Sequence, residues 1–191
     1  MKKLKLQVQM SVDGFVGGPN GELDWMTWNW DDKLKKYVND LTDSVDTILL
    51  GRKMTDGFIG HWANIVNNKP EDESYDFARK MIDKPKFVFT KTVNESPWGN
   101  TNTSLAKGDL TEEVKKLKAQ KGTDIVVYGG ATFVSSLVKE NLVDEYYLFI
   151  NPAVIGKGLS IFNTLDGKRG LRLVESIPFE CGVVLMKYVT A

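Results

Sequence analysis

The feature that most constrains the fold is the alternation of short apolar runs with amphipathic stretches through the middle of the chain. The apolar runs are DTILL (46–50), KFVFT (86–90), DIVVY (124–128) and EYYLFI (145–150). Each has the length of a strand, and helical spacing of apolar residues follows in 75–82, 111–121 and 131–140. Alternating strands and helices predict a mostly parallel sheet with helices on both faces.

Both ends of the chain predict strands as well. Residues 3–10 alternate apolar and polar side chains, which predicts a strand with one face in water. The runs LRLVESI (171–177) and GVVLMKYV (182–189) are separated by a short turn and predict an antiparallel hairpin. We therefore expect a single α/β domain over 1–191, of three-layer αβα type, with an antiparallel C-terminal hairpin.

Four further local features are expected from the pattern of caps and polar residues. Asp31 or Asp32 caps a helix in which apolar residues recur at helical spacing from 34 to 41, and residues 52–58 form the first turns of a short helix. Residues 91–110 are polar and predict an irregular connection. Thr111 is expected to cap the helix that follows it.

The composition excludes several classes of protein. A single cysteine, Cys181, and a single histidine, His61, exclude an internal disulfide and a Cys/His zinc site, so we expect no metal. We place Cys181 in the hairpin turn, as a small apolar residue, and His61 in a loop, an arrangement that does not favour a catalytic Cys-His pair. A net charge of zero argues against nucleic acid or an anionic membrane as partner, and no run approaches 18 apolar residues. The N-terminus has no signal-peptide pattern, and we expect a cytoplasmic protein.

The strand ends collect the residues that suit a phosphate. Ligands of such sheets bind beyond the carboxyl ends of the strands. Gly51 and the pair Gly129-Gly130 each end a strand and precede a helix start, where free N–H groups and the helix dipole favour an anion. Cations follow two strands, as Arg52 with Lys53 and as Lys91. Together these residues predict a site for a dinucleotide with an extra phosphate, such as NADPH, although no G-x-G-x-x-G motif is present.

Each of these features also has an ordinary structural explanation. Gly129-Gly130 serves a tight strand–helix turn equally well, and Arg52 with Lys53 is more often a solvated face. Asp13, followed by a glycine, is a common turn carboxylate. Only the occurrence of these features together, at successive strand ends, favours a binding site.

The order of the motifs resembles that of the dihydrofolate reductase-like superfamily. The motifs are SVDG (11–14), DWM (24–26), ILLGRKMT (48–55), FVFTKT (87–92), VVYGGATF (126–133) and YYLFINPAVIGKG (146–158). The closest resemblance is to the RibD C-terminal family, the reductase domain of bifunctional riboflavin biosynthesis proteins, in its stand-alone bacterial form. It covers nearly the whole chain and implies an NADPH-dependent reductase, acting on a small heterocycle such as a ribosylamino-pyrimidine.

The resemblance also implies roles for individual residues. Residues that would meet cofactor phosphates are Gly51, Arg52, Lys53, Met54, Thr90, Lys91, Gly129, Gly130, Ala131 and Thr132. Asp13 is our first candidate for proton donor or substrate anchor, given a pocket that raises its pKa, and Asp24 is the second. Ser11 and Trp25 are assigned to substrate binding, Trp25 by stacking on a flat ring, and residues 17–21 to a lid.

Two alternatives to this reductase remain open. True dihydrofolate reductases place an acid of the first long helix against the pterin, and this helix has no obvious inward acid, which argues against reduction of dihydrofolate. One cysteine with one histidine cannot supply the zinc ligands of a RibD deaminase domain, so the deaminase activity is not expected. The alternatives are dihydrofolate reductase itself and a non-catalytic, nucleotide-binding dimeric module. We expect a homodimer, with EYYLFINPAVI (145–155) as either a contact surface or an inner strand.

Overall fold

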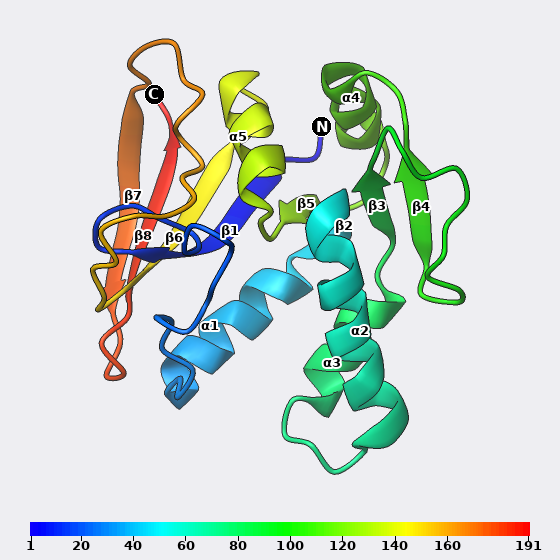
Figure 1. Cartoon of the computed structure of the whole chain (residues 1–191), viewed down its shortest axis with the longest axis horizontal. Helices are drawn as coiled ribbons and strands as arrows, with labels where there is room; N and C mark the ends of the chain where they lie inside the picture. Colours follow the sequence, from blue (N-terminus) through cyan, green and yellow to red (C-terminus); the bar gives the residue numbers. More distant parts are fainter.

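A computed structural model describes residues 1–191 and contains one eight-stranded sheet (Figure 1). The strands are β1 (Leu4–Ser11), β2 (Val45–Gly51), β3 (Lys86–Phe89), β4 (Thr103–Ala106), β5 (Asp124–Val127), β6 (Glu145–Asn151), β7 (Leu171–Pro178) and β8 (Val184–Thr190). The helices are α1 (Asp32–Asp43), α2 (Arg52–Asn68), α3 (Tyr75–Asp83), α4 (Leu110–Ala119) and α5 (Ala131–Lys139).

The sheet is parallel over most of its width. Its order is β4-β3-β2-β5-β1-β6-β8-β7, and every pair from β4 to β6 is parallel. The last two strands, β8 and β7, are antiparallel to their neighbours and form the predicted hairpin. The carboxyl ends of β3, β2, β5, β1 and β6 therefore meet at one edge of the sheet, where a ligand site is expected.

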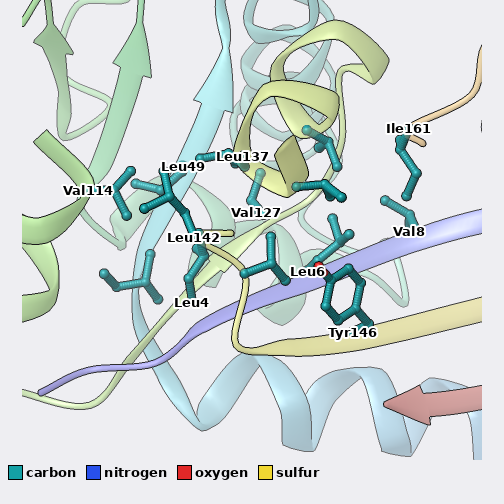
Figure 2. Packing of buried hydrophobic residues seen from close by; sticks show 14 of the residues in the cluster. Leu4, Leu6, Val8, Leu49, Val114, Val127, Leu137, Leu142, Tyr146 and Ile161 are labelled. Carbon is teal, nitrogen blue, oxygen red and sulfur yellow. The ribbon is translucent and has the colours of Figure 1, made fainter. Parts of the chain in front are cut away.

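Helices cover both faces of the sheet, so the three-layer prediction is confirmed. On one face α4 and α5 pack against β1, β5 and β6; on the other, α1 packs against β6 and β8, and α2 and α3 against β2 and β3 (Figure 1). Figure 2 shows the first of these interfaces, where the labelled side chains are Leu4, Leu6, Val8, Leu49, Val114, Val127, Leu137, Leu142, Tyr146 and Ile161. Removal of these apolar surfaces from water drives the layers together.

The prediction that one face of β1 is exposed to water is wrong. Lys5 and Gln7 are each only 7 % exposed, because α1 and the residue that caps its C-terminus, Ser44, cover this face. The Lys5 ammonium group is paired with Asp124 at 3.0 Å and donates to the Ser44 hydroxyl at 2.9 Å, which offsets part of the cost of burial. A central strand of a covered parallel sheet has no wet face.

Other local predictions are corrected by the structure. Helix α2 continues for 17 residues, so His61 lies exposed on a helix and not in a loop. Strand β4 lies within the stretch predicted to be irregular, and the side chain of Asp109, not Thr111, caps α4. The segment 145–151 is the inner strand β6, so it does not offer a contact surface. None of the helices has both the length and the apolarity that crossing a bilayer requires.

Candidate functional site

Two helices begin side by side at the carboxyl edge of the sheet. Strands β2 and β5 are hydrogen-bonded neighbours; β2 leads directly into α2, and β5 leads through the glycine pair into α5. The residues before these helices are Gly51 and Gly130, and neither helix has a side-chain cap. The first N–H groups of both helices are thus free to bind an anion, and both helix dipoles favour it.

The Gly129-Gly130 turn requires glycine at both positions. The φ angles are +152° at Gly129 and +84° at Gly130, in a region that other residues rarely adopt. A Cβ atom at either position would meet nothing closer than the Met54 side chain, at 3.9 Å and 3.6 Å respectively. Gly129 is itself buried and Gly130 is half-buried, so a ligand would approach the backbone at Gly130, where Met54 of α2 forms the neighbouring wall.

Gly51 is needed for packing. A Cβ atom there would lie 2.7 Å from Cβ of Phe133, in the first turn of α5. Phe133 also contacts Phe89 at the end of β3, with ring centroids 4.9 Å apart. The ends of β3 and β2 and the start of α5 are therefore held in one compact arrangement, which fixes the two helix N-termini relative to each other.

Arg52 is held by two partners. Its Nη1 donates to Asp56 Oδ2 at 2.8 Å, and its guanidinium carbon lies 5.6 Å from the centre of the Trp98 ring. The indole N–H of Trp98 donates to the other oxygen of Asp56 at 2.8 Å. The hydrogen bonds from Arg52 and Trp98 lower the pKa of Asp56, so its carboxylate stays ionised.

The other predicted cofactor residues have mixed environments. Lys53, Thr132 and Lys91 are exposed, but the ammonium of Lys91 donates to the carbonyls of Lys107 and Gly108 at 3.1 Å and 2.9 Å. The hydroxyl of Thr90, which is mostly buried, accepts from the N–H groups of Thr92 and Val93 and turns the chain after β3. Lys53 is therefore the cation of this group whose side chain has neither a hydrogen bond nor an ion pair within the protein.

Ser11 and Asp13 hold two loops together. Ser11 is 0 % exposed, and its hydroxyl donates to Asp13 Oδ1 at 2.7 Å and accepts from Phe15 N–H at 3.0 Å. Asp13 also accepts from the backbone N–H groups of Ile155, at 3.3 Å, and Gly156, at 2.7 Å. Assignment of Ser11 to substrate binding is wrong, because no surface of it is left for a ligand.

The expected pKa shift of Asp13 is wrong in direction. The hydrogen bond from Ser11, together with those from the backbone at 155 and 156, lowers the pKa of Asp13. A carboxylate kept ionised in this way is a poor proton donor at neutral pH. The geometry of Asp13 is that of an anchor for the loop after β6.

The tryptophan-rich segment before α1 is tied to the end of β6. Asn151, which is fully buried, accepts from Thr27 N–H at 2.9 Å and donates to Gln9 Oε1 at 2.8 Å. Within this segment Asp24 is exposed and forms no hydrogen bond, and Trp25 is half-buried with its indole N–H bonded to Glu22 O at 3.0 Å. The predicted lid is anchored at Gly17, which pairs with Leu159.

Sequence reasoning missed an aromatic pair next to the glycine turn. Tyr128 stacks on Phe58 of α2, with ring centroids 5.7 Å apart, and burial raises the pKa of Tyr128 to about 12. It also missed Asp56 and Trp98, which are 42 positions apart. In the sequence, the position of Tyr128 directly before Gly129 is the only indication of the Tyr128–Phe58 pair. The sequence gives no indication of the Asp56–Trp98 pair.

Comparison with known proteins decides the family. Residues 2–185 match the model of the RibD C-terminal domain. The chain belongs to the RibD C-terminal domain family. It is similar to a Bacillus subtilis (strain 168) protein named "Uncharacterized protein YyaP", with 32% identity over 188 residues, which is 98% of this chain and 94% of that one. It is also similar to the riboflavin biosynthesis protein RibD of Corynebacterium ammoniagenes, with 23% identity over 177 residues, 87% of this chain and 49% of that one.

Solved structures share the fold of this family. A putative riboflavin biosynthesis protein from Shewanella sp. PV-4 superposes with a TM-score of 0.74 at 23% identity, over 100% of this chain and 99% of that one. A deaminase/5-amino-6-(5-phosphoribosylamino)uracil reductase from Thermotoga maritima superposes with a TM-score of 0.65 at 16% identity, over 100% of this chain and 57% of that one. The RibD C-terminal fold is thus shown, and the chain carries the reductase-like domain of the riboflavin biosynthesis family.

Proposed function

We propose that this RibD C-terminal domain protein is an NADPH-dependent reductase that transfers a hydride to a small heterocyclic or ribosylamino-pyrimidine substrate. The observation that carries the proposal is the pair of uncapped helix N-termini, α2 and α5, at neighbouring strand ends. The relative named as a reductase, from Thermotoga maritima, supports the same class of reaction.

The residues at this edge fit an anionic dinucleotide. The backbone at Gly130 is partly exposed, and the N–H groups that follow Gly51 and Gly130 have no side-chain acceptor. Arg52 and Lys53 add positive charge at the start of α2. These residues would hold the phosphates of NADPH, and the bound cofactor would supply the hydride.

The remaining task of the chain is to orient the substrate and to deliver a proton. Of the two acids considered for this step, Asp24 has the free carboxylate, whereas Asp13 is bound to Ser11 and to the loop at 155–156. We therefore assign orientation of the substrate to the Asp24 carboxylate, which can accept hydrogen bonds from substrate N–H groups, and stacking of the ring to Trp25, which lies beside it on the same segment. The proton would then come from water. Asp24→Asn should lower kcat and leave NADPH affinity unchanged.

Dihydrofolate is a less suitable substrate than an aminopyrimidine. The buried side chains of α1 are Leu34, Val38, Leu41 and Thr42. None of them is a carboxylate, so the inward face of this helix offers no buried acid to protonate or bind a pterin. Turnover of dihydrofolate at a rate above that of the ribosylamino-pyrimidine would reverse this assignment.

A homodimer remains part of the proposal. Strand β7 is an edge strand of the sheet, and it exposes the adjacent apolar residues Leu173 and Val174. An exposed apolar edge is a common contact surface between copies of a chain. Sedimentation of the wild-type chain beside Leu173→Lys tests this surface, because a dimer formed there should dissociate in the variant.

The test of the reductase is consumption of NADPH by the purified chain. The first substrate is 5-amino-6-(5-phosphoribosylamino)uracil, and the second is dihydrofolate. NADPH oxidation with the pyrimidine, lost in the double variant Gly129→Ala, Gly130→Ala, is the expected result. Binding of NADPH without turnover of either substrate would favour the non-catalytic module.

A further inference from the structure

We infer that Asp56 and Trp98 are positioning residues that hold the Arg52 guanidinium ready for a phosphate group of the dinucleotide. This inference rests on the proposed function and identifies what controls its affinity. Neither Asp56 nor Trp98 would itself touch the cofactor. Both would act through Arg52.

The geometry leaves one edge of Arg52 unoccupied. The guanidinium group has five N–H donors in a fixed plane. One contact, from Nη1 to Asp56 at 2.8 Å, uses one edge of the group, and the Trp98 ring, 5.6 Å away, covers one side. The remaining donors of Arg52 have no acceptor in the protein. An arginine held in this way presents a fixed fork, which is the geometry that binds phosphate best.

The contacts of Asp56 and Trp98 with Arg52, which we call the arginine clamp, also connect two segments of the proposed site. Asp56 lies one turn after Arg52 in α2, whereas Trp98 comes from the connection between β3 and β4. That connection begins with Thr90 and Lys91, which the resemblance places near the cofactor. The 2.8 Å bond from Trp98 to Asp56 therefore fixes the start of α2 relative to the neighbouring strand end.

Two effects of Asp56 on a bound phosphate oppose each other. Its negative charge repels the phosphate, but its side chain is 61 % exposed, so water screens that repulsion. The opposing effect is entropic. A mobile arginine side chain loses much rotamer freedom when it binds a phosphate, whereas the contacts with Asp56 and Trp98 already restrict Arg52 before the phosphate binds. We expect orientation to outweigh repulsion, so removal of the carboxylate should weaken binding.

The experiment is a double-mutant cycle measured by calorimetric titration of the full chain with NADPH. Arg52→Gln should weaken binding about tenfold or more, as for loss of a charge-assisted hydrogen bond. Asp56→Asn should weaken it about threefold to tenfold, and Trp98→Phe, which keeps a ring but loses the N–H donor, should weaken it less. In the Arg52→Gln background, Asp56→Asn should change nothing further, because a positioning residue acts only through its partner.

Asp40→Asn is the matched control. Asp40 also forms an exposed pair with a cation four residues away, Lys36 at 2.7 Å, but on α1. It should leave NADPH affinity unchanged. Thermal unfolding of each variant shows whether it is folded, and a folded Asp56→Asn protein is required for the comparison.

Three outcomes would overturn the account, and they are distinguishable. Additive losses in the double variant would show that Asp56 does not act through Arg52. Tighter NADPH binding by Asp56→Asn would show that Asp56 competes with the phosphate. No binding of NADPH by the wild-type chain would overturn the proposed function itself.

Discussion

Gly51 at the end of β2 lies against Phe133 in the first turn of α5, so closely that a Cβ atom at position 51 would be 2.7 Å from Phe133 Cβ. Helix α2 begins directly after Gly51. The contact with Phe133 therefore sets the distance between the N-terminus of α2 and the N-terminus of α5. Since both helix N-termini belong to the proposed phosphate site, packing at Gly51 and binding of the dinucleotide should be coupled.

Gly51→Ala should therefore reduce both stability and NADPH affinity. An extra methyl group in a packed position costs about 1–3 kcal/mol, and here it pushes α5 away from β2. Urea denaturation and NADPH titration measure the two effects. The control is Gly57→Ala in the interior of the same helix α2, where a Cβ atom meets nothing within 4 Å, and it should stabilise the protein by up to about 1 kcal/mol.

Gly130→Ala should weaken NADPH binding through the backbone. An alanine at φ +84° costs about 1–2 kcal/mol, and relaxation of the turn would move the N–H groups at the start of α5. Gly156→Ala introduces similar strain at φ +73° with open space around it, in the loop after β6. A loss of affinity in the Gly156 variant equal to that in the Gly130 variant would mean that strain alone, not the phosphate site, explains the effect.

Lys86 should make stability depend on pH above neutrality. Its side chain is 0 % exposed and donates to the carbonyls of Met81, Ile82 and Lys84 at 2.7–2.8 Å, at the end of α3. Burial lowers its pKa from 10.5 to about 8. Between these two values the unfolded chain binds more protons at this site, so the contribution of Lys86 to the free energy of unfolding rises with pH.

The measurement is the free energy of unfolding of the wild type minus that of Lys86→Met, at several pH values from 7 to 9.5. The difference should increase with pH, by at most about 3 kcal/mol in all. Lys36→Met, which removes an exposed lysine, should show no such trend. A difference that stays flat across this range would mean that the pKa of Lys86 is not lowered.

Asp13→Asn should loosen the loop after β6 and leave NADPH affinity intact. The variant loses the carboxylate that accepts from Ser11 and from the N–H groups at 155 and 156. Faster hydrogen exchange at residues 155 and 156 is the direct readout. Since the pKa of Asp13 is lowered, its contribution is present above about pH 4 and is lost as the pH falls through the folded-state pKa, so wild type and variant should converge in acid.

The layers of the fold could be predicted from the sequence because they follow from periodicity. Runs such as DIVVY and EYYLFI have the length and branching of strands, and the helix stripe at 131–140 matches α5. The length of α2 could not be predicted, since Gly57 and Gly60 lower its helix propensity and its stability comes from packing of Ile59 and Ile65. Strand β4, Thr103–Ala106, was missed because it has only four residues and two of them are polar.

The candidate site was predictable only in part. The glycines and cations follow strands in sequence, so their meeting at one edge follows from the parallel topology. The partners of those residues could not be predicted: Trp98 and Asp56 meet through tertiary packing, and the pKa of Asp13 depends on Ser11 and on a loop over 140 positions away. Hydrogen-bond partners at long sequence separation leave no trace in a single sequence.

The most direct test of the central claim is titration of the purified chain with NADPH and, separately, with NADH, followed through the fluorescence of its five tryptophans. The two uncapped helix N-termini, together with Arg52 and Lys53, predict saturable quenching by NADPH and weaker binding of NADH, which lacks the extra phosphate. Absence of binding by either nucleotide would contradict the account and leave Gly129-Gly130 as a strand–helix turn.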